Sequence, residues 1–265
     1  MNAKQKLIEL YKESPFLKGI NITEDNIIDL VFYIDENENC KLCKGLEECK
    51  NKIAGIKPIY DGEELKYTPC DYAKHEERKR NVNSIFASNY MKDANFNDFE
   101  LNTESRIKAY EYVNKVLKND PDKAQGLYLV GKYGSGKTYF LSALANEFAQ
   151  KGIKTIIVFM PDLSRNLKSL MGQNMLESRV NALKYVDILM LDDLGGEMMT
   201  SWLRDEIIAP IIQYRLLNNK PIYISSNLNY EALKNHFKES TTDEDSTKSN
   251  RILERIRQMT KRVIF

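Results

Sequence analysis

The residues best suited to do chemistry lie in one short stretch, GKYGSGKTYF, at positions 131–140. It contains the pattern G-x-x-x-x-G-K-[ST], whose glycines let backbone N–H groups converge on an anion while the following helix points its positive end at the same place. The lysine can neutralise β- and γ-phosphates, and the threonine hydroxyl can bind Mg²⁺. The alternative is a glycine-rich turn with an incidental lysine. We expect a site for ATP and Mg²⁺, with nucleotide contacts from Gly131, Tyr133, Gly134, Ser135, Gly136, Lys137, Thr138 and Tyr139.

Two acids and an amide can complete a hydrolytic site. VDILMLDD ends in acids about 55 residues beyond the lysine of the loop. Asp192 is predicted to hold Mg²⁺ together with Thr138, mainly through water, and Asp193 to polarise the attacking water. Many ATPases place a glutamate at that second position, and Glu197 in LGGE is a reserve carboxylate. Asn227, which ends PIYISSN, is predicted to hold the lytic water; helix capping is the alternative for both the acids and the amide.

Basic residues near the end of the chain can supply charge to a second molecule. NRILERIRQMTKR places Arg251, Arg255 and Arg257 on one predicted helix. Arg251 and Arg255 are four residues apart and share a face. An arginine offered to the γ-phosphate of a neighbouring subunit would make hydrolysis depend on assembly. Arg255 is the first candidate and Arg251 the second, and a solvated or Glu254-paired basic face is the alternative.

The cysteines are clustered in the first third of the chain. In a chain expected to be cytoplasmic, such clustering favours metal binding over disulfides. Cys40 and Cys43 form C-x-x-C, which lets both thiolates reach one metal, and Cys49 and Cys70 complete four sulfur ligands, with His75 in reserve. We expect structural Zn²⁺ that supplies folding energy to a small domain. Four reduced core cysteines, or a redox C-x-x-C, are the alternatives.

The elements that must position these residues follow two patterns. Residues 1–73 show helical apolar spacing and then the cysteine-rich segment, which predicts a small, mainly helical domain. Residues 74–100 are rich in charge and asparagine and are predicted to be a linker with short helical pieces. In residues 101–265 short apolar strands alternate with helices, which predicts an α/β fold with a parallel sheet flanked by helices on both faces. The expected strands are GLYLV, TIIVFM, VDILMLDD, PIYISSN and RVIF.

Composition excludes some classes of protein. The chain of 265 residues is 42% hydrophobic and 29% charged, as in globular proteins that are soluble in water. It has no run of eighteen apolar residues, and MNAKQKLIEL does not resemble a signal peptide, so we expect a cytoplasmic protein without a membrane partner. The net charge of the whole chain is +1, but residues 1–73 carry a net charge of −4. This bias is too weak to predict strong nucleic-acid binding.

Taken together, GKYGSGKT, ILMLDDLGGE, YISSN and RILERIR resemble the AAA+ ATPases of the bacterial helicase-loader group, DnaI and DnaC, and their transposon-encoded IstB-type relatives. The resemblance covers about residues 100–265, and the cysteine-bearing front is similar to the DnaI type of primosomal protein. It implies an AAA+ fold that binds ATP. Because the arginine is expected to come from a neighbouring molecule, we expect ATP hydrolysis that is weak without partners, and self-assembly on nucleotide or DNA. The resemblance also implies that the front domain binds the replicative DNA helicase and that the ATPase domain binds single-stranded DNA.

Direct sequence support for DNA binding is unspecific. Single-strand binding needs a basic groove and stacking aromatics, for which Tyr133, Arg165, Lys168 and Arg179 are candidates, with a solvated face as the alternative. Two other functions remain open. One is an IstB-like regulator of transposition that acts as an ATPase. The other is a nucleotide-sensing module with negligible hydrolysis, for which the aspartate at position 193 would be meaningful.

Overall fold

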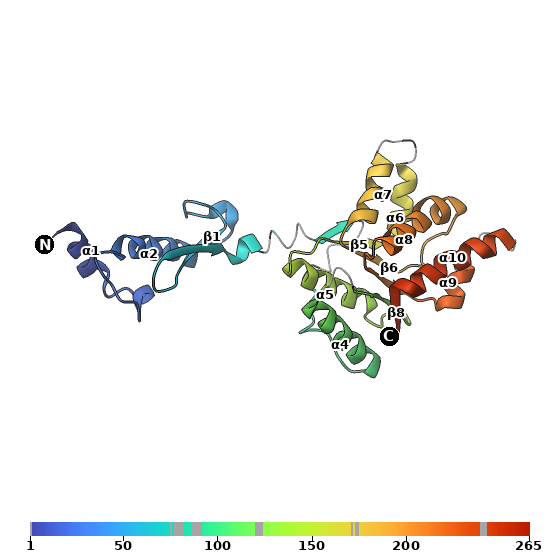
Figure 1. Cartoon of the computed structure of the whole chain (residues 1–265), viewed down its shortest axis with the longest axis horizontal. Helices are drawn as coiled ribbons and strands as arrows, with labels where there is room; N and C mark the ends of the chain where they lie inside the picture. Colours follow the sequence, from blue (N-terminus) through green and yellow to red (C-terminus); the bar gives the residue numbers. More distant parts are fainter. Residues whose placement is uncertain are drawn as a thin grey trace. The chain divides into compact units, whose positions relative to one another are not determined.

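The computed structural model divides the chain into two compact units, Met1–Glu77 and Arg78–Phe265 (Figure 1). The structure describes residues 2–74, 76, 82–85, 92–119, 124–170, 172, 175–238 and 243–265. Within these residues, no helix combines the length and the apolar character that crossing a membrane requires.

The first unit packs helices against a β-hairpin. Its elements are α1 (Ala3–Tyr11), η1 (Pro15–Leu17), α2 (Ile27–Lys41), η2 (Leu46–Glu48), β1 (Ile56–Tyr60) and β2 (Leu65–Pro69). α1 begins at a capping box, in which the side chains of Asn2 and Gln5 each accept a hydrogen bond from the other's backbone N–H. Leu17, Leu30 and Ile34 form its buried core, and the antiparallel hairpin packs on α2. A core this small supplies little stability by itself.

The second unit is built on a parallel sheet of six strands. These are β3 (Val82–Ile85), β4 (Gly126–Val130), β5 (Thr155–Phe159), β6 (Ile188–Asp192), β7 (Ile222–Ser226) and β8 (Thr260–Ile264). Their order is β3-β5-β6-β7-β4-β8, and every pairing is parallel. β4, β6 and β7 are buried along their whole length, as apolar strands covered on both faces must be. The predicted parallel α/β sheet is confirmed.

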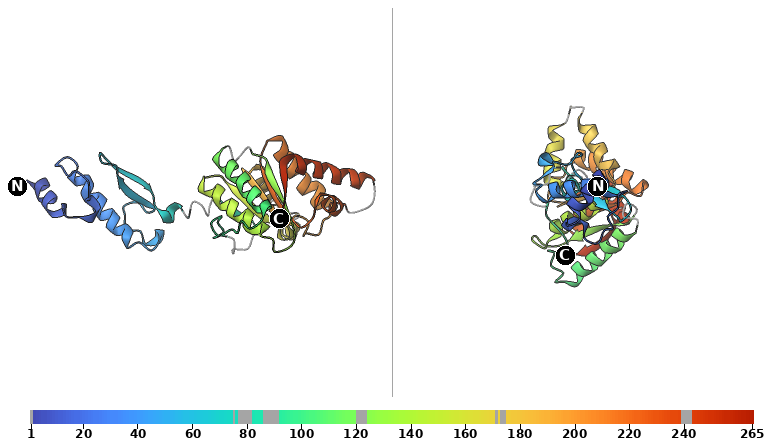
Figure 2. Two further views of the ribbon diagram at one scale, coloured as in Figure 1. Left: turned by 90° about the horizontal axis from the view of Figure 1, so that it is seen from below. Right: turned by 90° about the vertical axis from the view of Figure 1, so that its left-hand side faces the viewer.

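Helices cover both faces of this sheet. They are α4 (Glu104–Lys118), α5 (Lys137–Gln150), α6 (Met160–Ser169), α7 (Met175–Tyr185), the π-helical turn η4 (Leu203–Ile208), α8 (Ala209–Leu217), α9 (Tyr230–His236) and α10 (Asp243–Met259). Successive residues of β4 point to opposite faces. Tyr128 and Val130 join the core made with α6 to α10, whereas Leu127 and Leu129 join the core made with α4 and α5. Figure 2 shows the two helical layers on opposite sides of the strands.

Part of the segment 74–100 belongs to the second unit, where a linker was expected. β3 forms the edge of the sheet and pairs with β5, which satisfies the backbone polar groups on its inner side. Phe96 and Phe99 pack edge-on against Phe140 of α5. Strand pairing and aromatic burial therefore outweigh the charge and asparagine content of this segment. His75, the reserve metal ligand, lies outside the described residues.

Candidate nucleotide-binding site

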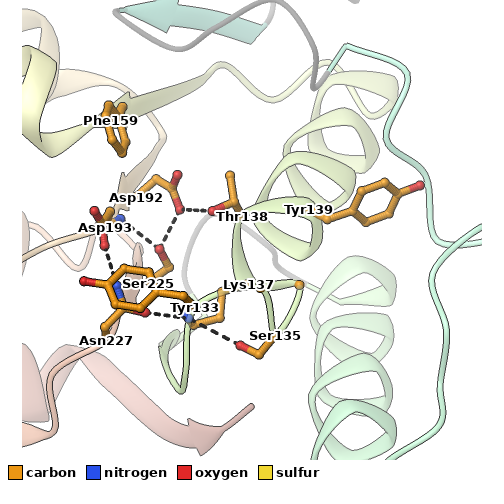
Figure 3. A pocket seen from close by; sticks show the side chains of 12 residues that line it. Tyr133, Ser135, Lys137, Thr138, Tyr139, Phe159, Asp192, Asp193, Ser225 and Asn227 are labelled. Carbon is orange, nitrogen blue, oxygen red and sulfur yellow. Dashed lines mark hydrogen bonds between the residues drawn. The ribbon is translucent and has the colours of Figure 1, made fainter. Parts of the chain in front are cut away.

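A cavity of about 330 Å³ opens where β4, β6 and β7 end (Figure 3). Parallel α/β sheets bind their ligands at this carboxyl edge. It is lined by Tyr133, Gly134, Ser135, Gly136, Lys137, Thr138, Tyr139, Phe159, Asp192, Asp193, Ser225 and Asn227. The sheet thus brings together the phosphate-loop residues, both predicted acids and the predicted amide. Of the predicted nucleotide contacts, Gly131 alone is not among the lining residues.

The loop between β4 and α5 has a shape that requires its glycines. Gly134 and Gly136 have φ angles of 73° and 88°, a left-handed conformation that other residues rarely adopt. A Cβ atom at Gly131 would lie 2.2 Å from the backbone oxygen of Phe265, which runs beside the loop. α5 begins at Lys137, directly after Gly136, so its first N–H groups face the cavity. A helix N-terminus in this position favours a phosphate.

Lys137 is held inside the loop by oxygen atoms. Its Nζ donates to the carbonyls of Gly131 at 2.9 Å and Lys132 at 2.8 Å, and to Oδ1 of Asn227 at 3.0 Å. The residue is 7% exposed, and this burial lowers the pKa of its ammonium group. Phosphate oxygens offer the same ammonium group charged acceptors, which bind it more strongly than neutral carbonyls do. When a phosphate enters the cavity, the ammonium group of Lys137 can replace its contacts with these neutral oxygens by contacts with phosphate oxygens.

Asp192 and Thr138 form the predicted magnesium side of the cavity. Thr138 Oγ1 donates to Asp192 Oδ1 at 3.0 Å, and Ser225 Oγ donates to the same oxygen at 2.5 Å. Burial nevertheless raises the pKa of Asp192. A buried carboxylate beside a hydroxyl is an oxygen donor set that fits Mg²⁺, which keeps several waters when it binds to proteins.

Ser225 is a site residue that the sequence reasoning missed. It is 1% exposed and lines the cavity next to both acids. Besides its bond to Asp192, its Oγ accepts a hydrogen bond from the N–H of Asp193 at 2.9 Å. The signal was available in PIYISSN, because side chains two residues apart in a strand share one face of the sheet, and Ser225 lies two residues before Asn227.

Asp193 and Asn227 lie side by side, as the sequence predicted for water-handling groups. Asn227 Nδ2 donates to Asp193 Oδ1 at 2.8 Å, while its own Oδ1 accepts from Lys137. Asp193 has a φ of 55°, an uncommon conformation for a residue with a side chain. Burial, and then the negative charge of Glu197, raise the pKa of Asp193. A raised pKa makes a carboxylate a better proton acceptor.

α5 and β5 each contribute one aromatic residue to the cavity lining, Tyr139 and Phe159. Tyr139, which was predicted to contact nucleotide, lines the cavity, and Figure 3 shows its ring directed away from the acids. Its hydroxyl lies 3.2 Å from the carbonyl and 3.3 Å from the backbone nitrogen of Asn95, so the side chain fastens the segment before α4. Phe159 lines the cavity at the end of β5. The last residue of a parallel strand faces the carboxyl edge.

The three arginines of α10 do not line the cavity of their own chain. Arg257 pairs with Glu254 at 2.7 Å and lies over the ring of Tyr230. Arg251 is exposed and Arg255 is half-buried, and neither has an ion pair or hydrogen bond with another described residue. The basic face therefore has one paired guanidinium and two without an ion pair or side-chain hydrogen bond among the described residues.

The cysteines lie around the end of α2 and the end of β2. All are free and half-buried: Cys40, Cys43, Cys49 and Cys70. Asn51 Nδ2 donates to the sulfur of Cys40 at 3.4 Å. Burial raises the pKa of the Cys40 thiol, and the proximity of the other three cysteines adds to the increase. Among the residues that the structure describes, no three or more His, Cys, Asp or Glu side chains are arranged to hold a metal ion.

Replacing Asp192 with asparagine should raise the thermal unfolding midpoint of the nucleotide-free protein at neutral pH. Asparagine keeps an Oδ1 acceptor for Thr138 and Ser225 but removes a buried charge. The pKa of Asp192 is raised in the folded state. The carboxylate of Asp192 therefore binds a proton more tightly in the folded wild type than in the unfolded chain. Wild type therefore loses stability as pH rises from the ordinary aspartate value of about 3.9 through the raised pKa.

Thermal scans at several pH values measure this effect. The difference between the unfolding midpoints of Asp192→Asn and wild type should be present at pH 7. It should shrink as the pH falls through the raised pKa of Asp192 toward the ordinary aspartate value. A stabilisation of about 1 kcal/mol corresponds to roughly 2–4 °C in a chain of this size. Asp93→Asn, at an exposed position, is the control. A midpoint for Asp192→Asn at or below the wild-type value at pH 7 contradicts the prediction.

Comparisons with known proteins agree with this geometry. Residues 71–263 match the family model of the IstB-like ATP binding proteins. Over 256 residues the chain is 34% identical to the replicative helicase loader DnaI of Bacillus subtilis (strain 168). The aligned region covers 92% of this chain and 82% of that protein. A crystal structure of DnaI superimposes with a TM-score of 0.64 at 37% identity, covering 69% of this chain and 96% of the other.

A second solved structure gives the same result. The crystal structure of the DnaC helicase loader aligns with a TM-score of 0.55 and 25% identity, covering 67% of this chain and 99% of that one. The matches thus include the phosphate loop, the acids and the amide that meet in the cavity. The chain belongs to the family of IstB-like ATP binding proteins and is a relative of the replicative helicase loader DnaI.

Proposed function

We propose that the protein is an ATP-dependent loader that delivers the replicative DNA helicase onto single-stranded DNA in the cytoplasm, during replication initiation or restart. One joint observation carries the proposal. Lys137, Asp192 and Asn227 meet in a single cavity of an ATP-binding domain, and the similarity to DnaI spans 92% of the chain, which includes most of the first unit. A nucleotide-driven domain joined to an adaptor is suited to placing one protein on DNA.

In this proposal the residues of the cavity bind and hydrolyse ATP. The loop N–H groups and Lys137 bind the β- and γ-phosphates. Thr138 and Asp192 hold Mg²⁺, which neutralises charge on the phosphates when bound. Asp193 accepts a proton from the attacking water, and Asn227 orients that water. The contact between Asn227 and Asp193 supports this division of roles.

Hydrolysis is proposed to be weak in the isolated chain and to increase on assembly. None of the described residues that line the cavity is an arginine. Arg255, with Arg251 as second choice, is therefore proposed to reach the γ-phosphate in a neighbouring molecule. Their lack of partners among described residues supports this role, whereas the pairing of Arg257 with Glu254 argues against Arg257.

The first unit is proposed to bind the helicase. Its small core leaves several large apolar side chains exposed, including Leu42 at 78%, Leu10 at 70% and Ile53 at 62%. Contiguous exposed apolar side chains mark protein-interaction surfaces, and these residues are the candidates for such a surface. The net charge of −4 over residues 1–73 suits a partner with a basic surface.

We also propose that the four cysteines bind structural Zn²⁺. The donor set is right for zinc and the thiols lie close enough to affect one another, but their side chains, as described, are not arranged around one point, so binding would have to draw them together. Purified full-length protein should then contain about one zinc per chain, and chelation should destabilise the first unit because metal binding supplies folding energy.

Elemental analysis of the purified chain and of Cys43→Ser tests this. The variant is expected to lose the zinc, while Ser14→Ala in the same unit should retain it. Four thiols that titrate freely in metal-free, fully folded wild type would count against the site.

Single-stranded DNA is the second proposed partner. Tyr133 is 84% exposed at the mouth of the cavity, where a base can stack on it. Lys168 and Arg179, on α6 and α7, add positive charge. Arg165 is a weaker candidate because it pairs with Asp162 on its own helix.

The family description supports one other function. The matching model is named for IstB-like proteins, so an ATPase that regulates transposition is the second candidate. Such a protein acts with a transposase. A nucleotide-sensing module without hydrolysis would bind ATP in the same cavity and show no turnover, which an ATPase assay distinguishes.

Co-purification tests the proposed function. The full chain should retain the hexameric replicative helicase of its host, and a chain that lacks residues 1–77 should not. Retention of the helicase by the shortened chain, or by neither chain, would contradict the proposal. Retention of a transposase instead would favour the second candidate.

A further inference from the structure

The turn that follows β6, residues 193–197, is fastened to the end of β7. The N–H of Leu194 donates to the carbonyl of Ser225 at 2.9 Å, and Ser226 Oγ donates to the carbonyl of Leu194 at 2.5 Å. These bonds hold Asp193 in its left-handed conformation at the wall of the cavity. Such a conformation persists only where its surroundings determine it.

Glu197 closes this turn from the other end. Its side chain is completely buried, and Oε2 accepts the N–H of Gly195 at 2.9 Å. Oε1 lies 2.9 Å from Nε2 of His236 at the end of α9. Both carboxylate oxygens are therefore used, and neither faces the cavity, which Glu197 does not line. The side chain connects the turn to a helix on one face of the sheet.

The same turn supports the carboxylate of Asp193 directly. A Cβ atom at Gly196 would lie 2.2 Å from Asp193 Oδ2, so this oxygen rests on the backbone of Gly196. The N–H of Gly196 also donates to the Asp193 carbonyl at 3.0 Å. A shift of the Gly195–Gly196 backbone must therefore move the Asp193 carboxylate relative to Asn227. Glu197 is the side chain that fixes this backbone.

We propose that Glu197, oriented by His236, is a positioning residue that sets the direction of the Asp193 carboxylate during ATP hydrolysis. This inference rests on the proposed role of Asp193 in handling the attacking water. Glu197 touches neither nucleotide nor water. It acts through the backbone of the turn, which its carboxylate fixes at Gly195. Asp193 is the shorter of the two acids used at this position in ATPases, so its reach depends on its backbone.

Steady-state ATP hydrolysis by full-length variants tests the proposal. Misplacing a reacting group by about 1 Å costs roughly 100-fold, so Glu197→Ala should lower kcat by about 10- to 100-fold while KM and the affinity for a fluorescent ATP analogue stay within about twofold. Glu197→Gln keeps the acceptor for Gly195 and should retain most of kcat. His236→Ala should lower kcat less, and adding it to Glu197→Ala should cause no further loss, because coupled residues are not additive.

The controls separate this inference from the proposed function. Asp193→Asn is measured in parallel: if it keeps the wild-type rate, the role proposed for Asp193 fails. If Asp193→Asn is inactive while Glu197→Ala keeps full kcat, the positioning role is overturned and the proposed function stands. A loss of ATP affinity together with thermal stability in Glu197→Ala, shared by Glu197→Gln, would show a purely structural residue and also overturn the inference.

Discussion

The Lys137→Ala variant is expected to lose ATP hydrolysis by at least about 100-fold, the usual effect of removing one preorganised charged donor. Lys137 is the only cation among the described residues that line the cavity. Its ammonium group is held by two loop carbonyls and by Asn227, so it already points to where the phosphates bind. Alanine leaves the loop N–H groups in place but removes the charge that opposes the β- and γ-phosphates.

Hydrolysis and binding of a fluorescent ATP analogue should be measured together on this variant. Lys132→Ala is the matched control, because Lys132 belongs to the same loop but its side chain is exposed and does not line the cavity. The control should behave like wild type in both assays. Wild-type turnover by Lys137→Ala, or an equal loss in both variants, would be incompatible with the site described.

The Arg255→Ala variant is expected to lose assembly-stimulated hydrolysis by about 1,000-fold or more, the effect of removing an arginine that stabilises the transferring phosphoryl group from a neighbouring molecule. Its basal rate as an isolated chain should not change, since no described arginine lines its own cavity. The reason lies in α10, where Arg255 has no ion pair with a described residue and Arg257 has one with Glu254.

Hydrolysis should be measured with and without the helicase and single-stranded DNA. Arg257→Ala is the control, and it should keep the stimulation because its charge is already neutralised within the helix. Mixing Arg255→Ala with Lys137→Ala should restore part of the stimulated ATP hydrolysis. Lys137→Ala then supplies Arg255, and Arg255→Ala supplies an intact cavity. Full stimulation of Arg255→Ala alone would exclude this arginine, and the same test then applies to Arg251.

The phosphate loop could be predicted from sequence because its parts are contiguous. Loop, lysine and threonine follow one another, and their geometry depends on local backbone conformation. Asp192 and Asn227 could be predicted for a different reason: Asp192 ends one apolar strand, Asn227 directly follows another, and parallel strands end at one edge of a sheet. Their separation from the phosphate loop in sequence therefore did not prevent the prediction that they share one site. Tyr139 lines the cavity, but the phase of α5 turns its side chain toward Asn95.

Other features depend on tertiary contacts that carry little local signal. β3 has the sequence VNSI within a polar segment, and only its pairing with β5 identifies it as a strand. Ser225 gains its role from the register between β6 and β7, which places it beside Asp192. Glu197 was considered as a reserve catalytic acid, but its contact with His236, 39 positions later, could not be foreseen from spacing.

Helicase loading onto single-stranded DNA tests the central claim most directly. Circular single-stranded DNA with an annealed labelled strand is incubated with the replicative helicase, the full-length protein and ATP, and release of the strand is measured. Wild type should promote release, whereas Lys137→Ala should give no more than the helicase alone. Equal release with Lys137→Ala would show that delivery does not depend on nucleotide in this cavity, and the account would be wrong.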